Sequence, residues 1–346
     1  MHHPTVNYRP YIQVNMSPFL LDIAAVIVGF SLLIWGADRF VNGAAAIASH
    51  LGVSPLLIGL TIVGFGTSAP EILVSGMAAW QGNPGLAIGN AIGSNIANIG
   101  LILGTTALIV PLTVHSKILR REYPIMLAVS LLAVGLMANG SLTVTDGIIL
   151  LIALVIVLWL LAKFALQDRK GQDALGKEFE EELPLEISLS KAVGLFLIGL
   201  TALLIGSRFL VWGATNIAVS LGVSDLVIGL TIVAIGTSLP ELAAGISSAL
   251  KGEHDIAIGN IIGSNIFNLL AVLPVPALFG PGPFDPLALS RDLPVMIGLT
   301  IALYAFRYHF IAPGKINRLE GFILLSVFVG YQTMLYLDAA KAVGNA

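Results

Sequence analysis

The sequence predicts an all-α polytopic membrane protein with ten transmembrane helices arranged as two inverted five-helix repeats. Three observations predict this class: a very apolar composition, apolar runs of membrane-spanning length, and an internal repeat. Of the 346 residues, 56% are hydrophobic and only 11% are charged, and the mean hydropathy is +0.92. Soluble proteins carry about 25% charged residues, so most of the surface of this chain must face lipid.

Apolar runs of about 20 residues can each cross a bilayer as a helix. We expect such spans at 18–40, 52–80, 86–111, 120–139, 143–166, 191–214, 222–250, 255–279, 292–311 and 317–338. The first run is too long for a secretory signal and lacks a small-residue cleavage site, so we expect an uncleaved helix. The one substantial polar segment, 167–190, is expected to be a solvated linker between a first half, 1–166, and a second half, 191–346.

The distribution of basic residues predicts the orientation. Most of the 17 Lys and Arg residues lie in or beside loops that follow odd-numbered spans. The opposite side holds only Arg9, Arg208, Arg291 and Lys341. Because an excess of Lys and Arg marks cytoplasmic loops, we expect a multi-pass protein of the cell (inner) membrane. Both termini would lie outside, and the 167–190 linker would lie in the cytoplasm.

The most informative feature is the internal repeat. Residues 51–98 align without a gap on residues 221–268, and more than half of the aligned positions are identical. The copies read GLTIVGFGTSAPE and AIGNAIGSNIAN in the first half, and GLTIVAIGTSLPE and AIGNIIGSNIFN in the second. With five spans in each half, the second copy enters the membrane from the opposite side. Transporters built this way bind their substrate near the midplane where the copies meet. Channels can also have inverted repeats, so the architecture favours a transporter without proving one.

Two acidic residues lie well inside apolar spans, Glu71 and Glu241, at the same place in each copy. A charged carboxylate at the centre of a membrane helix costs about 2.5–3.5 kcal/mol or more. No Lys or Arg lies near either glutamate within the repeat spans, so we expect a bound cation to supply the missing positive charge. The alternative is a pair of protonated, hydrogen-bonded structural glutamates.

A proline precedes each glutamate. Pro70 and Pro240 are expected to kink their helices and to free a backbone carbonyl one turn earlier. At membrane depth such carbonyls are tolerated where they are buried or line a hydrated cavity. Gly64, Thr67 and Glu71 share one helix face by their spacing. Carbonyl, hydroxyl and carboxylate oxygens together suit a hard cation, and Ca²⁺ takes six to eight of them.

The second motif of each copy adds neutral oxygens. Asn90, Ser94 and Asn98 follow one another at i+4 and therefore share a face. Their counterparts in the second copy are Asn260, Ser264 and Asn268. Asn95 and Asn265 lie off this stripe and are expected to hydrogen-bond to neighbouring helices, and such bonds alone could also explain the stripe. Two carboxylates with neutral oxygens have a formal charge of −2, which one Ca²⁺ or two Na⁺ would neutralise.

These motifs resemble a known family. GTSAPE and GTSLPE, each followed by GNxxGSNxxN, are similar to the two alpha repeats of the sodium/calcium exchanger superfamily, in its short prokaryotic branch. The resemblance covers nearly the whole chain. It implies an antiporter that exchanges Ca²⁺ for Na⁺ by alternating access, with spans one and six sliding across the core. It implies metal ligands at Glu71, Glu241, Thr67, Thr237, Ser68, Ser238, Gly64, Ala234, Ser94, Asn98, Ser264 and Asn268.

Two departures from the family pattern have consequences. Asn268 stands where potassium-dependent members have Asp, so coupling to K⁺ is not expected. Gly64 replaces a more usual alanine, which leaves a backbone carbonyl contact intact. The short 167–190 linker cannot hold the large calcium-sensing domains of animal members.

Several other functions were weighed against this one. A Ca²⁺/H⁺ antiporter on the same fold is the nearest alternative, although proton-coupled relatives typically carry a GNxxE pattern that is absent here. A cation channel is a further alternative, but two embedded carboxylates would hold Ca²⁺ too tightly for fast flux unless several ions crowd the site. An enzyme is not expected, because no His or Lys lies beside Ser68 or Ser238 to act as a base. We expect no cofactor, no nucleic-acid partner and no obligatory protein partner, only the bilayer and the transported ions.

Overall fold

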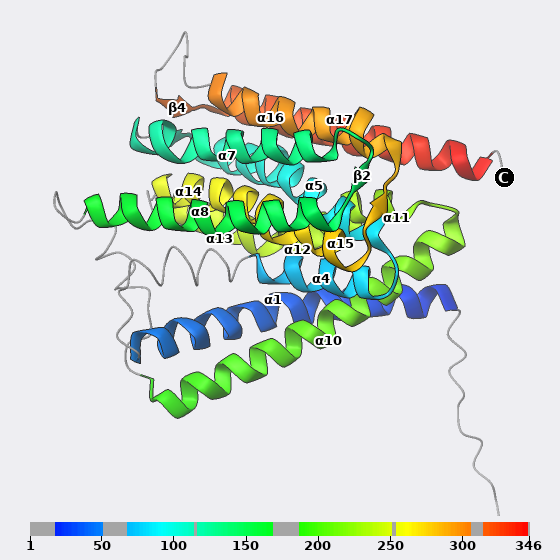
Figure 1. Ribbon diagram of the computed structural model, residues 1–346, viewed down its shortest axis with the longest axis horizontal. Helices are drawn as coiled ribbons and strands as arrows, with labels where there is room; N and C mark the ends of the chain where they lie inside the picture. The colour runs from blue at the N-terminus through cyan, green and yellow to red at the C-terminus, as the bar shows by residue number, and fades with distance from the viewer. Residues whose placement is uncertain are drawn as a thin grey trace, which may run out of the picture.

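The computed structural model is a bundle of helices that run roughly along its long axis (Figure 1). It describes residues 18–50, 68–113, 116–168, 187–250, 254–305 and 314–344. Within these ranges, 7 helices are long and apolar enough to cross a membrane, and two shorter apolar helices cover Glu122–Met137 and Asp225–Thr237. The predicted class, an all-α polytopic membrane protein, is confirmed, and every expected span contains described helix.

The helices follow the two-half plan. The first half contains α1 (Pro18–His50), α4 (Ala69–Trp80), α5 (Pro84–Ala97), the π-helical turn η2 (Asn98–Leu103), α6 (Gly104–Ile109), α7 (Ser116–Met137) and α8 (Val144–Asp168). The second half contains α10 (Leu189–Leu221), α11 (Asp225–Ile228), η3 (Gly229–Val233), α12 (Ala234–Thr237), α13 (Leu239–Leu250), α14 (His254–Phe267), η4 (Asn268–Val272), α15 (Pro274–Phe279), η5 (Ala288–Asp292), α16 (Leu293–Ala305) and α17 (Arg318–Gly344).

The first helix of each half is longer than its expected span. The expected spans end at residues 40 and 214, but α1 continues to His50 and α10 to Leu221. The residues added to α1 include four alanines, the strongest helix former. In the added part of α10, the Asn216 amide donates to Asp22 of α1 at 2.8 Å. Of the expected second span, 52–80, residues 52–67 lie outside the described residues.

In each repeat a helix begins just before the motif glutamate. The expected span 222–250 is divided at Ser238, where φ is −87° and ψ is 5°, and α13 begins at the next residue. In the first copy Ser68 has nearly the same angles, φ −88° and ψ 3°, and α4 begins at Ala69. Both helices therefore begin one residue before a proline, Pro70 or Pro240, and the break at Ser238 is the kind that proline position predicts.

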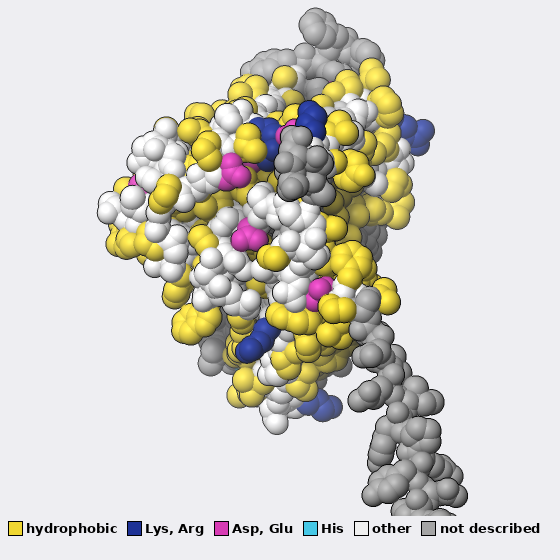
Figure 2. All heavy atoms as spheres, turned by 90° about the vertical axis from the view of Figure 1, so that its right-hand side faces the viewer, with side chains coloured by type: hydrophobic (Ala, Val, Ile, Leu, Met, Phe, Trp, Pro, Cys, Tyr) yellow, Lys and Arg dark blue, Asp and Glu magenta, His cyan; other side chains and the backbone are white. Residues whose placement is uncertain are grey.

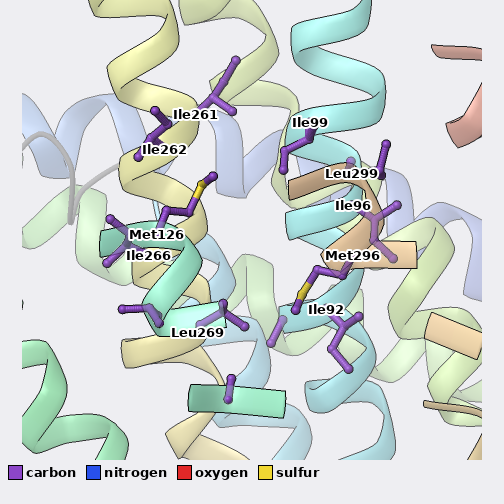
Figure 3. Packing of buried hydrophobic residues seen from close by; sticks show 14 of the residues in the cluster. Ile92, Ile96, Ile99, Met126, Ile261, Ile262, Ile266, Leu269, Met296 and Leu299 are labelled. Carbon is purple, nitrogen blue, oxygen red and sulfur yellow. The ribbon is translucent and has the colours of Figure 1, made fainter. Parts of the chain in front are cut away.

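The apolar interior lies between α5 and α14. Ile92, Ile96 and Ile266 come from these helices and are at most 2% exposed, and Met126 of α7 and Met296 of α16 pack among them (Figure 3). The outer surface is also apolar: Val155 and Trp159 of α8 are 67% and 60% exposed. A view of one end of the bundle shows hydrophobic side chains beside many uncharged polar or backbone atoms and several charged side chains (Figure 2). Such exposed apolar side chains fit contact with lipid.

Helices α1 and α10 form a separate pair on one side of the bundle (Figure 1). Glycines recur in each at every seventh residue: Gly29, Gly36 and Gly43, and Gly199, Gly206 and Gly213. A Cβ at Gly199 would stand 2.3 Å from the backbone nitrogen of Phe40, and one at Gly29 would stand 2.7 Å from that of Leu210. We call this the glycine seam. Its contacts run in opposite directions along the two chains, so the helices are antiparallel and touch backbone to backbone.

Two short ribbons connect the halves. Strand β1 (Leu112–Thr113) pairs antiparallel with β4 (Lys315–Ile316), and β2 (Ser141–Leu142) pairs antiparallel with β3 (Gly282–Pro283). In the ten-span plan, β1 and β4 follow odd-numbered spans, whereas β2 and β3 follow even-numbered ones. Each ribbon therefore joins loops that the plan places on the same membrane side.

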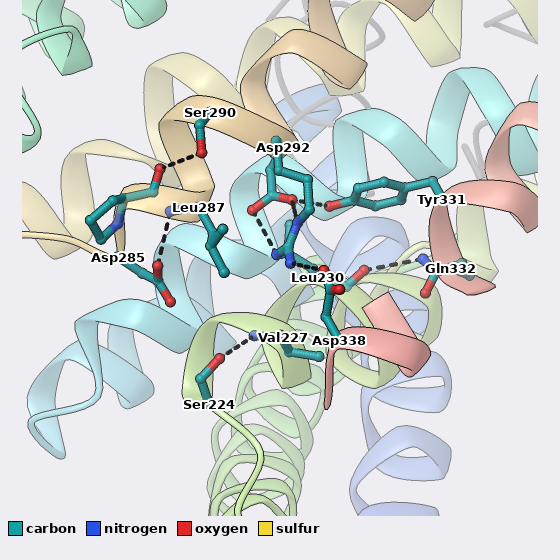
Figure 4. A network of polar contacts seen from close by, with 12 residues as sticks. Ser224, Val227, Leu230, Asp285, Leu287, Ser290, Asp292, Tyr331, Gln332 and Asp338 are labelled. Atoms are coloured by element: carbon teal, nitrogen blue, oxygen red, sulfur yellow. Dashed lines mark hydrogen bonds and ion pairs between the residues drawn. The ribbon is translucent and has the colours of Figure 1, made fainter. Parts of the chain in front are cut away.

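A buried polar network fixes α17 against the core (Figure 4). The Arg291 guanidinium donates to Asp292 at 2.6 Å and to Asp338 at 3.1 Å. The Tyr331 hydroxyl donates to Asp292 at 2.8 Å, and the Gln332 amide donates to a carbonyl of η3 at 3.3 Å. Since the Arg291 and Asp292 side chains are only 8% and 0% exposed, this ion pair is buried and depends on both partners.

Candidate cation site

The two predicted glutamates occupy equivalent places in the fold. Glu71 lies in the first turn of α4 and Glu241 in the first turn of α13, and each is 1% exposed. The side chains are close enough for their charges to interact. None of the ion pairs in the described part of the chain includes either glutamate. Their negative charge therefore has no side-chain cation to balance it there.

Each glutamate helix packs against the asparagine-bearing turn of the other half. Helix α4 contacts η4, which begins at Asn268, and α13 contacts η2, which begins at Asn98. The contacts cross between the repeats, so the two copies build one site together. A π-helical turn begins at the same motif residue in both halves, and such turns occur frequently at functional sites.

Buried oxygens without hydrogen-bond partners gather on the predicted ligands. Within the residues that the structure describes, they are Ser68 Oγ, Glu71 Oε2, Asn98 Oδ1, Ser238 Oγ, Glu241 Oε1 and Oε2, Ser264 Oγ and Asn268 Oδ1. Buried polar groups in proteins are nearly always hydrogen-bonded, and each one left unpaired costs about 1–3 kcal/mol. The remaining unpartnered side chains include Thr106 on α6 and His254 at the start of α14. A set of oxygens on both repeats that lacks donors is what a cation site requires.

The other predicted ligands of the second half lie beside these oxygens. Thr237 is 1% exposed and lies one turn before Glu241. Its hydroxyl lies within hydrogen-bond distance of three acceptors: the Val233 carbonyl at 3.0 Å, the side-chain oxygen of Asn90 at 3.2 Å and the Ala234 carbonyl at 3.4 Å. The Ala234 carbonyl also accepts from the backbone nitrogen of Ser238 at 3.2 Å.

In the first half, Ser94 and Asn98 are buried as expected. The Ser94 hydroxyl donates to Asn90 at 3.5 Å, and the Asn98 amide donates to the Asn265 oxygen at 3.0 Å. The second bond confirms Asn265 as a partner between helices and leaves the Asn98 oxygen without a donor. Asn95, expected in the same role, has no hydrogen-bond partner within the described ranges.

Two predicted ligands, Gly64 and Thr67, lie outside the described residues. Two features of the site have no counterpart in the sequence pattern. The π-helical turns η2 and η4 have no local sequence signal beyond the motif asparagines at which they begin. Asn90 was placed on the oxygen stripe, but its hydrogen bonds to residues of other helices could not be read from spacing.

The chemistry of this arrangement is that of a hard-cation site. It offers carboxylate, hydroxyl, amide and carbonyl oxygens, which Ca²⁺ and other hard cations prefer. The described residues include no group of three or more His, Cys, Asp or Glu side chains that could hold a metal ion. The donors therefore differ from the nitrogen and sulfur ligands of soft transition-metal sites.

Comparison with known proteins identifies the family. The sequence model of the family described as "Sodium/calcium exchanger protein" matches residues 21–163 and 191–337. The chain belongs to this family. The two matched segments correspond to the two halves on either side of the polar linker.

Relatives that match most of this chain come from bacteria and archaea. The chain is 50% identical to "Putative antiporter CaxA" of Alkalimonas amylolytica over 90% of this chain and 97% of the relative. It is 46% identical to "Inner membrane protein YrbG" of Escherichia coli, over 92% of this chain and 97% of the relative. It is 34% identical to "Sodium/calcium exchanger MaX1" of Methanosarcina acetivorans, over 91% and 99%. This placement confirms the prokaryotic branch of the family and a multi-pass membrane protein.

A solved structure of the same family has a similar fold. The sodium-calcium exchanger NCX_Mj, soaked with Na⁺ and Sr²⁺, matches with a TM-score of 0.61 at 35% sequence identity. The match covers 90% of this chain and 97% of that one. The family match and this fold together support the exchange of Ca²⁺ against another cation.

Proposed function

We propose that this chain is a secondary antiporter that exchanges Ca²⁺ for Na⁺ by alternating access at a site formed around Glu71 and Glu241. The observation that carries the proposal is the set of buried, unpartnered oxygens contributed by both repeats. The names of two relatives, which are sodium/calcium exchangers, support the choice of ions. The two-glutamate site and the use of Na⁺ are our own assignments.

Charge balance explains why two different ions would compete. With both glutamates ionised, the site has a formal charge of −2, and no side-chain cation in the described ion pairs offsets it. One Ca²⁺ neutralises this charge, and so do two Na⁺. Because an unneutralised site is costly in hydrocarbon, it would change its access in a loaded state more readily than when empty. Such a rule couples the two ion fluxes.

The glycine seam supports a moving part. Helices α1 and α10 touch along their length with no side chain between their backbones at the glycines. A pair that is packed so closely would move across the core as one body. We propose that this pair slides to expose the site first on one side of the membrane and then on the other.

The test is transport in proteoliposomes that contain the purified protein. We expect ⁴⁵Ca²⁺ uptake when an outward Na⁺ gradient is imposed, and no comparable uptake with an outward K⁺ gradient. Uptake driven only by a H⁺ gradient would show that the coupling ion is H⁺ and not Na⁺. Calcium flux without any counter-ion gradient would indicate a channel and would refute antiport.

The orientation can be tested with the same protein. We propose that both termini lie outside the inner membrane, that the 167–190 linker is cytoplasmic, and that the protein performs transport without an enzymatic step. The chain has no cysteine, so a single introduced cysteine is the only thiol that can be labelled. A cysteine in the linker should resist a membrane-impermeant maleimide in intact cells and react after lysis. Labelling in intact cells would invert the topology.

A further inference from the structure

We infer that Asn90 is a positioning residue that holds ligands from the two repeats in register and does not bind the cation itself. This role rests on the proposed function, because it concerns the geometry of the same site. The spacing of the motif places Asn90 on the oxygen stripe, which by itself is equally compatible with a ligand. Its contacts decide between the two roles.

Both ends of the Asn90 amide have protein partners. Its nitrogen donates to the backbone carbonyl of Glu71 at 3.2 Å and to the Ser75 hydroxyl at 3.0 Å. Its oxygen faces the Thr237 hydroxyl at 3.2 Å, whose proton it shares with the Val233 carbonyl, and the Ser94 hydroxyl at 3.5 Å. Both donor hydrogens of the amide therefore have acceptors, and its oxygen contacts the hydroxyls of two proposed ligands. The side chain is 0% exposed.

These bonds join three elements at the site. Glu71 and Ser75 belong to α4, Asn90 to α5, and Thr237 ends α12 in the other half. The amide therefore ties the backbone of one proposed carboxylate ligand to the hydroxyl of a proposed ligand from the opposite repeat. The Thr237 hydroxyl also lies within hydrogen-bonding reach of the Glu71 side chain, so Asn90 contacts both Glu71 and a hydroxyl that lies beside the Glu71 carboxylate. Ligands that are fixed in this way lose less entropy when the ion binds.

Among the described residues, the second repeat does not reproduce the donor half of this arrangement. Asn260 occupies the position equivalent to Asn90, but its amide nitrogen has no hydrogen-bond partner among the described residues. The position equivalent to Ser75 is Gly245, which has no side chain to accept a bond. The chain thus contains a matched control: the same amide at the same motif position without the serine contact.

A double-mutant cycle on Ca²⁺ affinity tests the role. Isothermal titration calorimetry of the purified full-length protein in Na⁺-free detergent solution gives the affinity for CaCl₂. We expect Asn90→Leu to weaken binding about tenfold, and Asn260→Leu by less than about threefold, since each lost hydrogen bond accounts for roughly fivefold. Asn90→Leu and Thr237→Val should be coupled, with a combined loss smaller than the product of the single losses by about threefold or more. For Asn260→Leu combined with Thr237→Val, the loss of Ca²⁺ affinity should equal the product of the two single losses.

Other variants separate positioning from general stability. Ser75→Ala removes one acceptor of the Asn90 amide and touches no proposed ligand, so Ca²⁺ affinity should fall about fivefold even if Asn90→Leu does not fold. Unchanged affinity in Ser75→Ala, equal losses at Asn90 and Asn260, or independent effects of Asn90 and Thr237 would each overturn the inference. A wild-type protein that binds no Ca²⁺ would instead overturn the exchanger site itself and remove the basis for this role.

Discussion

Neutralising one glutamate is the most direct test of the site. In Glu71→Gln or Glu241→Gln, the side chain keeps its shape but the formal charge falls from −2 to −1. Two unit charges about 4 Å apart interact by roughly 4 kcal/mol at an effective dielectric constant of 20. For a divalent ion the lost attraction is about 8 kcal/mol, because the repulsion between the carboxylates is the same with and without the ion and cancels in the binding free energy. A loss of this size corresponds to roughly 10⁵-fold to 10⁶-fold weaker Ca²⁺ binding, so binding should no longer be detected.

The same estimate predicts a different result for sodium. For one Na⁺ ion the lost attraction is about 4 kcal/mol, half of the loss for Ca²⁺. Na⁺ affinity should therefore fall roughly a thousandfold, far less than Ca²⁺ affinity, whereas Na⁺-driven ⁴⁵Ca²⁺ uptake should be abolished. Titration calorimetry and uptake in proteoliposomes measure the two effects, and circular dichroism with a melting curve verifies the fold. Uptake at the wild-type rate in either variant would refute the assignment of the glutamates.

Three further predictions concern the seam, the buried ion pair and a neutral ligand. Gly199→Val should lower the melting temperature in detergent and stop exchange, since its Cβ would stand 2.3 Å from the backbone of α1. Gly194→Val in the same helix has nothing within 4 Å of its Cβ and should be nearly neutral. Equal effects of the two substitutions would contradict the close packing at the glycine seam. Asp292→Asn should destabilise the protein by about 3 kcal/mol, because it leaves the buried Arg291 without its main partner; an unchanged denaturation midpoint would argue against this. Ser264→Ala removes an unpartnered hydroxyl, so Ca²⁺ affinity should fall about fivefold while stability does not, and unchanged affinity would exclude Ser264 as a ligand.

The parts of the fold that could be predicted are those encoded locally. Apolar run length predicts helices, and the proline before Glu241 predicts the break at Ser238 because proline cannot continue the hydrogen-bond ladder. The ends of α1 and α10 could not be predicted in this way. Apolar length reports where a helix leaves lipid, whereas helix propensity and partner contacts decide where it ends.

The residue types of the site could be predicted from the sequence, but their hydrogen-bond partners could not. Spacing along a helix predicts that Asn90, Ser94 and Asn98 share a face. It does not reveal that Asn98 donates to Asn265 or that Asn90 is occupied by Thr237, since these partners are distant in sequence and meet only through tertiary packing. The predicted ligand roles themselves stay predictions until ion binding is measured.

The ribbons suggest which parts of this protein can shift. One ribbon, β1–β4, connects the loop after the third span to the loop before the last span. The other ribbon, β2–β3, connects the loop before the fifth span to the loop after the eighth span. Both ribbons join the first half of the chain to the second, so the central helices are held together at both ends of the bundle. In the portion of the chain that the structure describes, neither ribbon includes α1 or α10. A transporter whose ion-binding site must stay undistorted would be built in this manner. Its central helices would form a rigid core, and the helix pair α1 and α10 would be free to move against it.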